Sequence, residues 1–303
     1  MDNYLKLCYN FCIVKVSRLF WKYKVRNFIK KLIIVFLISA LLTVATLFCS
    51  GCEVEQVLTE SDRETTQYLD SSAQDIATCT PNESLFALVY NVQRLQSYCV
   101  SITGKVEASL TTQKIEGAKY KSGDSALYVS RSTSTFKNTA NKIFVQGDTV
   151  LFRNGNAKTN VYEDECAKFG YDDYIKEYGT DFRAISNYDL NENTILKSEL
   201  LSAENGIYTY RYEIDVNKGV NGYRVNMRKI GNLGDYPTFT KSTLTVSITE
   251  NFMPVSIVQQ DEYTVKMLFN VSCVSEITST YERLNDLSVA IPEYDFYTSQ
   301  LGD

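Results

Sequence analysis

Residues 80–110, TPNESLFALVYNVQRLQSYCVSITGKVEASL, contain the change of pattern that decides the fold. The stretch opens with a helix start, in which Thr80 caps, Pro81 takes the first helical position and Glu83 follows three residues after the cap. Spacings of three and four then predict one buried helix face, made of Leu85, Leu88, Val89, Val92 and Leu95. The apolar period next becomes two, which predicts a strand through Val100, Ile102, Val106, Ala108 and Leu110.

Further strands with tight turns follow along the chain. Residues 143–152 are typical of a hairpin that turns at residues 146–148, and turn residues recur at 204–206 and 250–254. The alternation near the end predicts a strand through Val265, Met267, Phe269, Val271 and Cys273. Short helices are predicted within 163–185 and 220–229. We therefore expect an antiparallel meander with two or three helices, which is a mainly β, α+β domain.

Upstream of this domain, the chain has the features of an export leader. Residues 32–48 are uncharged and apolar, a basic cluster precedes them, and an acidic segment follows. The next residues, Cys49-Ser50-Gly51-Cys52, resemble the lipobox of bacterial lipoproteins, which implies a signal peptide over 1–51 and lipid attachment at Cys52. The alternative is an uncleaved signal anchor. Both place the domain on the extracytoplasmic face of the cell membrane.

The charge of the exported part limits its partners. Of 31 basic and 36 acidic residues, eight bases and one acid lie in residues 1–51, which leaves 23 bases, 35 acids and a formal charge of −12. Nucleic acid is therefore not an expected partner, because phosphate binding needs a basic surface. Residues 52–79 are acidic and polar, and we expect them to be a flexible tether between the lipid and a domain over residues 80–303.

The order of elements resembles that of the LolA/LppX-like superfamily of lipoprotein carriers. A helix comes first, a long meander follows, and the turn Asn251-Phe252-Met253-Pro254 leads into strands that end at Ile291-Pro292. The resemblance covers about residues 80–295. It implies a strongly curved antiparallel sheet, or half-barrel, with helices on its concave side and an apolar cavity between them for acyl chains.

Catalytic and metal-binding patterns are weak. The chain has no histidine, which excludes Ser-His-Asp and Cys-His nucleophile systems and His-ligated zinc. A carboxylate pair for glycoside hydrolysis could come from one charged region, where solvated surface is the favoured interpretation. Its acids are Glu163, Asp164, Glu165, Asp172 and Asp173. Residues 189–200 begin like a calcium loop but lack its glycine and its last acid. We expect no enzyme activity, cofactor or metal.

Four cysteines remain after the leader: Cys79, Cys99, Cys166 and Cys273. Outside the cytoplasm they could form two disulfides in three pairings, or simply be buried as small apolar residues. The sequence does not choose between these.

Three tyrosines, Tyr208, Tyr210 and Tyr212, share one face of a predicted strand. They could line a ligand cavity together with Val246 and Phe269, or they could stabilise the sheet by cross-strand packing. The leading hypothesis is a lipid-anchored protein that binds a hydrophobic or lipid-like ligand in a half-barrel. The alternative is a surface adhesin or an accessory module of an envelope complex, with a filled core.

Overall fold

The computed structural model describes residues 64–109, 111–135, 138–267 and 269–302, which lie within one compact unit, Leu58–Asp303. The predicted leader 1–51, its apolar stretch 32–48, Cys52 and the first part of the tether lie outside the described residues, as does Leu110. In the described part, no helix has the length and apolar character needed to cross a membrane.

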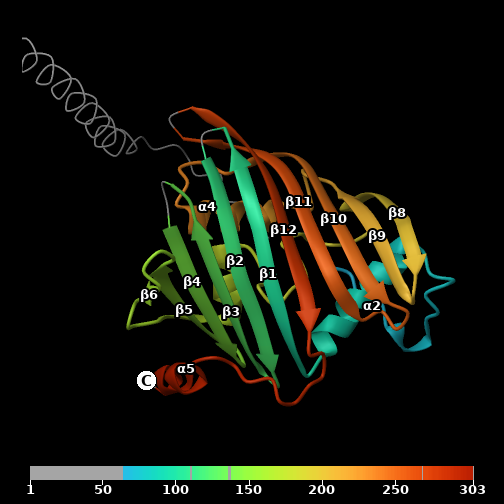
Figure 1. Cartoon of the computed structure of the whole chain (residues 1–303), viewed down its shortest axis with the longest axis horizontal. Coiled ribbons are helices and arrows are strands. Elements are labelled where there is room, and N and C mark those ends of the chain that lie inside the picture. The colour runs from blue at the N-terminus through green and yellow to red at the C-terminus, as the bar shows by residue number, and fades with distance from the viewer. Residues whose placement is uncertain (1–63, 110, 136–137, 268, 303) are drawn as a thin grey trace, which may run out of the picture. The chain divides into compact units, whose positions relative to one another are not determined.

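Twelve strands form one antiparallel sheet with helices packed on it (Figure 1). The elements before the middle of the chain are η2 (Ser71–Ala73), α2 (Pro81–Arg94), β1 (Ser97–Ala108), β2 (Thr111–Ser122), β3 (Ser125–Thr133), β4 (Asn138–Gln146), β5 (Thr149–Asn156), β6 (Val161–Tyr162), β7 (Ala167–Gly170) and α3 (Tyr171–Tyr178). Those after it are β8 (Ile195–Glu204), β9 (Ile207–Ile214), α4 (Asn221–Gly231), β10 (Thr238–Thr249), β11 (Pro254–Lys266), β12 (Asn270–Glu282) and α5 (Tyr294–Leu301).

The strand order confirms the predicted fold class. It runs β6-β5-β4-β3-β2-β1-β12-β11-β10-β9-β8, and β7 also pairs with β5. Two meanders, β1 to β6 and β8 to β12, are therefore joined along β1 and β12, where Val100 lies opposite Tyr281. The sheet curves and stays open, with β8 at one edge and the short strands β6 and β7 at the other (Figure 1). The domain is mainly β and α+β.

Helix α2 forms as its sequence predicts. Thr80 Oγ1 accepts a hydrogen bond from Glu83 N at 3.3 Å, and Thr80 N donates to Glu83 Oε2 at 2.7 Å, which completes the capping box. Leu85, Leu88 and Val92 are buried against the sheet. The predicted helices in 163–185 and 220–229 are also present, as α3 and α4.

Helix α5 was not expected, because the sequence predicts strands that end at Ile291-Pro292 and no helix after them. It packs on the opposite face of the sheet from α3. Tyr297 stacks on Phe144 with 4.8 Å between the ring centroids, whereas the neighbours Ile143 and Val145 pack with the residues of α3. Successive strand residues face opposite sides, so β4 is covered on both faces. The α5 sequence lacks a regular apolar period, which is why the helix was missed.

Two other boundaries differ from expectation. Residues 64–79, placed in the tether by sequence, pack on the domain: Gln67 N donates to Leu190 O at 2.8 Å, and Ile76 is buried in the core. The packed chain therefore begins before Thr80. The predicted strand through Val265 and Cys273 is two strands, because β11 ends at Lys266 and β12 begins at Asn270. The apolar alternation runs on through 267–269, where the sequence has no glycine or proline to mark a break.

Candidate functional site

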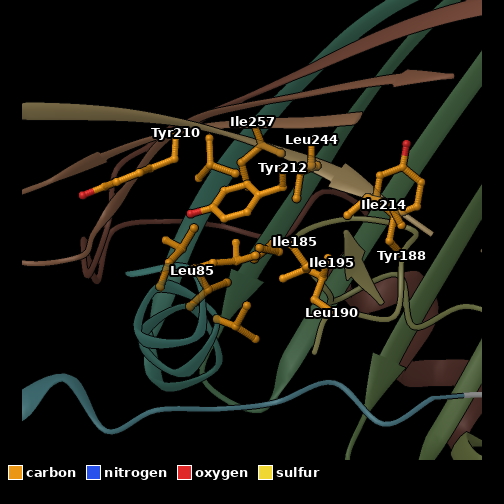
Figure 2. Packing of buried hydrophobic residues seen from close by; sticks show 14 of the residues in the cluster. Leu85, Ile185, Tyr188, Leu190, Ile195, Tyr210, Tyr212, Ile214, Leu244 and Ile257 are labelled. Atoms are coloured by element: carbon orange, nitrogen blue, oxygen red, sulfur yellow. The ribbon is translucent and has the colours of Figure 1, made fainter. Parts of the chain in front are cut away.

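The predicted tyrosine face is filled core. Tyr210, Tyr212 and Val246 are buried on the face that α2 covers, and Tyr208 beside them is half-buried. Tyr212 OH donates to Pro81 O of α2 at 2.6 Å, and Ser84 Oγ donates to Tyr210 OH at 3.4 Å. Figure 2 shows Tyr212 reaching from the sheet toward Leu85 on α2. The space that these residues were expected to line is occupied by the helix.

Phe269 lies apart from the tyrosines. It is in the turn between β11 and β12, and 56% of its surface is exposed. Met267 in the same turn is 68% exposed. The structure therefore brings four of the five predicted ligand-binding residues together and leaves Phe269 out. The grouping of Phe269 with them was wrong because the strand ends at Lys266.

The described residues line a partly open cavity of about 560 Å³, at a different place on the inner face of the sheet. Its walls are the second half of α2, the start of β1, the β2–β3 and β4–β5 turns, the segment 179–190 that follows α3, and the packed residues Thr66 and Tyr68. The apolar part of the lining is Val89, Val92, Ala126, Val145, Ile185 and Leu190. The charged part is Lys121, Asp124, Asp148, Asp181, Arg183 and Asp189. The cavity is thus amphipathic, with a size typical of small-molecule sites.

The segment 179–190 forms one wall and has no regular secondary structure. It starts where α3 ends, at Gly179, whose positive φ of 78° favours glycine; a Cβ there would also lie 2.3 Å from Gly222 O. Lys119 Nζ, on β2, donates to Ala184 O at 2.8 Å, and Asn187 Nδ2 donates to Gln259 Oε1 on β11 at 3.4 Å. Polar contacts from the sheet therefore hold this wall of the cavity.

A buried carboxylate supplies another anchor for the same segment. Asp261 on β11 is 2% exposed, and its Oδ1 accepts hydrogen bonds from Tyr188 OH and Ser242 Oγ, each at 2.6 Å. Its Oδ2 accepts from Gln259 Nε2 at 3.0 Å and from Ser275 Oγ at 3.3 Å. Burial raises the pKa of Asp261, and the four hydrogen bonds oppose that rise. Ser242 and Ser275 are the cross-strand neighbours of Asp261, so the cluster joins β10, β11 and β12 to Tyr188.

Charges at the cavity are of both signs. Burial lowers the pKa of Lys121, the nearby Arg183 charge lowers it further, and Asp124 opposes the shift. Lys121 Nζ donates to Gln93 O at 3.0 Å. Arg183 Nε lies 3.4 Å from Asp181 Oδ1, and its guanidinium carbon lies 3.8 Å from the Tyr171 ring centroid. Burial also lowers the pKa of Lys119, behind the wall, to about 8. Lys119, Lys121 and Arg183 are therefore all engaged in contacts with neighbouring protein groups.

The structure also shows where the candidate catalytic acids, the calcium-like segment and the cysteines lie. Glu163, Asp164, Glu165, Asp172 and Asp173 are all exposed, in agreement with solvated surface. In the calcium-like segment, Asn191 Oδ1 instead accepts from Asn193 N at 2.7 Å and from Thr194 N at 3.1 Å, which makes a local turn. Within the described ranges, no three His, Cys, Asp or Glu side chains are grouped as a metal site would require. Cys79, Cys99, Cys166 and Cys273 are free thiols.

Sequence reasoning missed the residues that position the cavity wall, although a signal was present. In β11 the inward residues are Ile257, Gln259, Asp261 and Tyr263. In β2, Lys119 lies opposite Val100 and Lys121 opposite Tyr98, so both lysines share the face of two buried residues. Polar residues at inward positions of a strand need partners across the core. The inward polar residues of β2 and β11 therefore mark the part of the sheet that an irregular segment covers instead of a helix.

Comparison with known proteins yields little. No model of a protein family matches the chain, and no curated protein does. Among solved structures, a DUF1329 family protein from Desulfovibrio piger is similar at 10% identity over 74% of this chain and 100% of that chain, with a TM-score of 0.26. MucB in its complex with MucA(peri) is similar at 6% identity over 67% of this chain and 94% of its own, with a TM-score of 0.13. At these scores neither likeness supports an argument about function.

Proposed function

We propose that this protein is an extracytoplasmic, lipid-anchored binding protein that holds an amphipathic, lipid-like small molecule without transforming it. The observation that carries the proposal is the cavity of about 560 Å³ beside the core that is packed under α2. Its apolar lining suits an acyl or other hydrocarbon portion, and its charged lining suits a polar head group. The ligand site is therefore not the tyrosine face but the space between α2 and the segment 179–190.

The anchoring part of the proposal rests on sequence. The lipobox-like residues 49–52 follow an apolar stretch, and Cys52 would carry the lipid. A Cys52→Ser variant tests this in the bacterial host. We expect the parent protein to incorporate labelled palmitate and to lose residues 1–51, and the variant to do neither. Palmitate incorporation that survives this substitution would contradict the assignment of Cys52.

The ligand is tested by photolabelling the full chain in membranes with a diazirine fatty acid and mapping the modified peptides. We expect modification of the peptides that contain Val89, Val92 and Ala126. An Ala126→Phe variant should lose this labelling, because the added ring occupies the cavity. Ala118→Phe is the matched control, since Ala118 lies opposite Val129, on the other face of the sheet from Ala126.

The outcome decides between two functions. Labelling that is absent from residues 64–303, while other membrane proteins in the same preparation react with the probe, would refute a lipid-like ligand in the cavity. It would favour the second candidate, an interaction module of the cell envelope. The packing of Tyr210 and Tyr212 under α2 supports that candidate, because it leaves no room for a ligand on the tyrosine face.

A further inference from the structure

The two edges of the sheet differ in how they are protected. At one edge, β5 is covered by two short strands, β6 of two residues and β7 of four. At the other edge, β8 runs for ten residues and pairs only with β9 among the described strands. An edge strand presents unpaired N–H and C=O groups to any further strand, and proteins usually shorten or cover such edges. The β8 edge is long and uncovered within the described part of the chain.

This edge also carries apolar side chains. Leu196 is 62% exposed, Leu200 50% and Leu201 42%, whereas the other exposed residues of the strand, apart from Ala203, are polar or charged. The pairing of β8 with β9 is irregular on both sides of the run 197–200, near Leu196 and near Leu201. Such bulges limit edge pairing to the regular run between them. Any partner strand is thus restricted to a short stretch of defined register.

The regular run is complementary to itself. If a second β8 lies antiparallel about a two-fold axis through Ser198, Ser198 faces its own copy. Lys197 then faces Glu199 of the second copy, and Glu199 faces Lys197 of the second copy. Both residues are on the outer face, because they pair with Glu213 and Arg211 of β9. The same register brings Leu196 near Leu200 of the second copy. Within one chain, Glu199 already lies 3.5 Å from Lys197 Nζ and 3.5 Å from an Arg211 guanidinium nitrogen. One isologous contact would add two ion pairs between the copies and two apolar pairs.

We infer that this protein forms a homodimer through antiparallel pairing of its β8 edges, centred on Ser198. A second copy is the partner because the stretch supplies both members of each charge pair. A strand of an unrelated protein would have to reproduce this pattern. The dimer would join two sheets into one and bury the exposed leucines. This inference does not depend on the ligand proposed for the cavity.

Disulfide trapping of the full chain in membranes tests the register. Residues directly opposite in an antiparallel pair have Cβ atoms about 4.5–5.5 Å apart, close to what a disulfide spans. With a mild copper–phenanthroline oxidant, Ser198→Cys should give a disulfide-linked dimer above the background of the native cysteines. Chains with Lys197→Cys should crosslink to chains with Glu199→Cys, and each of these alone should crosslink less than the mixture.

Exchanging the charges of Lys197 and Glu199 tests whether the partner is a second copy of this chain. In the Ser198→Cys background, Lys197→Glu or Glu199→Lys alone should lower dimer formation by about tenfold, because like charges then face each other twice. The double variant Lys197→Glu/Glu199→Lys should restore it, which also shows that the single variants did not fail by misfolding. Crosslinking of Ser198→Cys no greater than that of the parent would overturn the inference. So would a double variant as poor as the singles.

Discussion

The inner face of the sheet is covered in two ways, by helix α2 over one part and by the irregular segment 179–190 over another. Under α2 the core is closely packed: Leu88 and Tyr212 are fully buried, and the Tyr212 hydroxyl donates a hydrogen bond to the helix. Under the segment, Lys119 and Asp261 hold the chain at separate points and a cavity of about 560 Å³ remains. A regular apolar stripe fills space continuously, whereas point contacts leave space between them.

Truncating one leucine in each region should give the largest difference in the free energy of unfolding between the two regions. Leu88 and Leu190 are 0% and 1% exposed, but Leu190 borders the cavity. We expect Leu88→Ala to lower the free energy of unfolding by about 3–5 kcal/mol and Leu190→Ala by roughly 2–3 kcal/mol, because Leu190 loses fewer packing contacts. Urea denaturation followed by circular dichroism measures both. Equal losses would mean that the two regions are packed alike.

The sequence predicts the two covered regions of the sheet to different extents, depending on the kind of residue involved. The α2 region follows from period alone: Leu85, Leu88 and Val92 repeat at helical spacing, and Val246 alternates in a strand. The filled core beneath α2 could not be predicted, because a pattern shows which residues face inward and not whether a helix closes onto them. Sequence reasoning therefore left Tyr208, Tyr210 and Tyr212 open between lining a cavity and packing in the sheet, and the structure has packing there.

The cavity region could be predicted only in part. Asp261 and Lys119 are recognisable as inward polar residues, yet their partners, Tyr188 and Ala184, are 73 and 65 residues away along the chain. Such contacts depend on the path of a segment with no period of its own. Helix α5 and the break between Lys266 and Asn270 were missed for a related reason, since α5 has no regular apolar period and the sequence of 267–269 has no glycine or proline.

Enlarging one alanine in each region should give the next largest difference in the free energy of unfolding. Ala87 on α2 is 0% exposed, and Ala126 lines the cavity. Ala87→Leu should lower the free energy of unfolding by about 1–3 kcal/mol, because a packed core must shift to admit the added carbons. Ala126→Leu should change it by less than about 1 kcal/mol, since the side chain can extend into space. A larger loss for Ala126→Leu in the same urea titration would show that the cavity is not available volume.

Asp261 allows a test by pH of how the irregular segment is held. Asp261→Asn places an amide among groups that all donate, so we expect a loss of about 1–3 kcal/mol. The size of that loss should depend on pH. Burial raises the pKa of Asp261 above its ordinary value of 3.8, so the folded protein retains the proton over a range in which the unfolded chain has released it.

The direction in which stability changes with pH follows from that difference in proton binding. The stabilisation linked to this proton is fully present below pH 3.8 and is lost as pH rises through the folded pKa. The advantage of the parent over Asp261→Asn should therefore be greatest near pH 3.5 and should shrink to a plateau at higher pH. Urea titrations of both proteins at matched pH measure it, and other groups cancel in the comparison. An advantage that grows with pH would mean that the folded state favours the ionised carboxylate.

Lys119 should give the smallest effect, confined to the wall of the cavity. Lys119→Met keeps the length of the side chain and removes the hydrogen bond to Ala184 O, which is worth about 1 kcal/mol. Part of that loss is offset because a charge held at a pKa of about 8 no longer has to be desolvated. Global stability should then change by less than about 1 kcal/mol, whereas amide exchange of residues 180–190 should become several-fold faster. Exchange within α2 serves as the internal control, because Lys119 does not hold that helix. If both regions exchange faster together, the segment and the helix open as one unit and the division of the inner face into two kinds of cover does not hold.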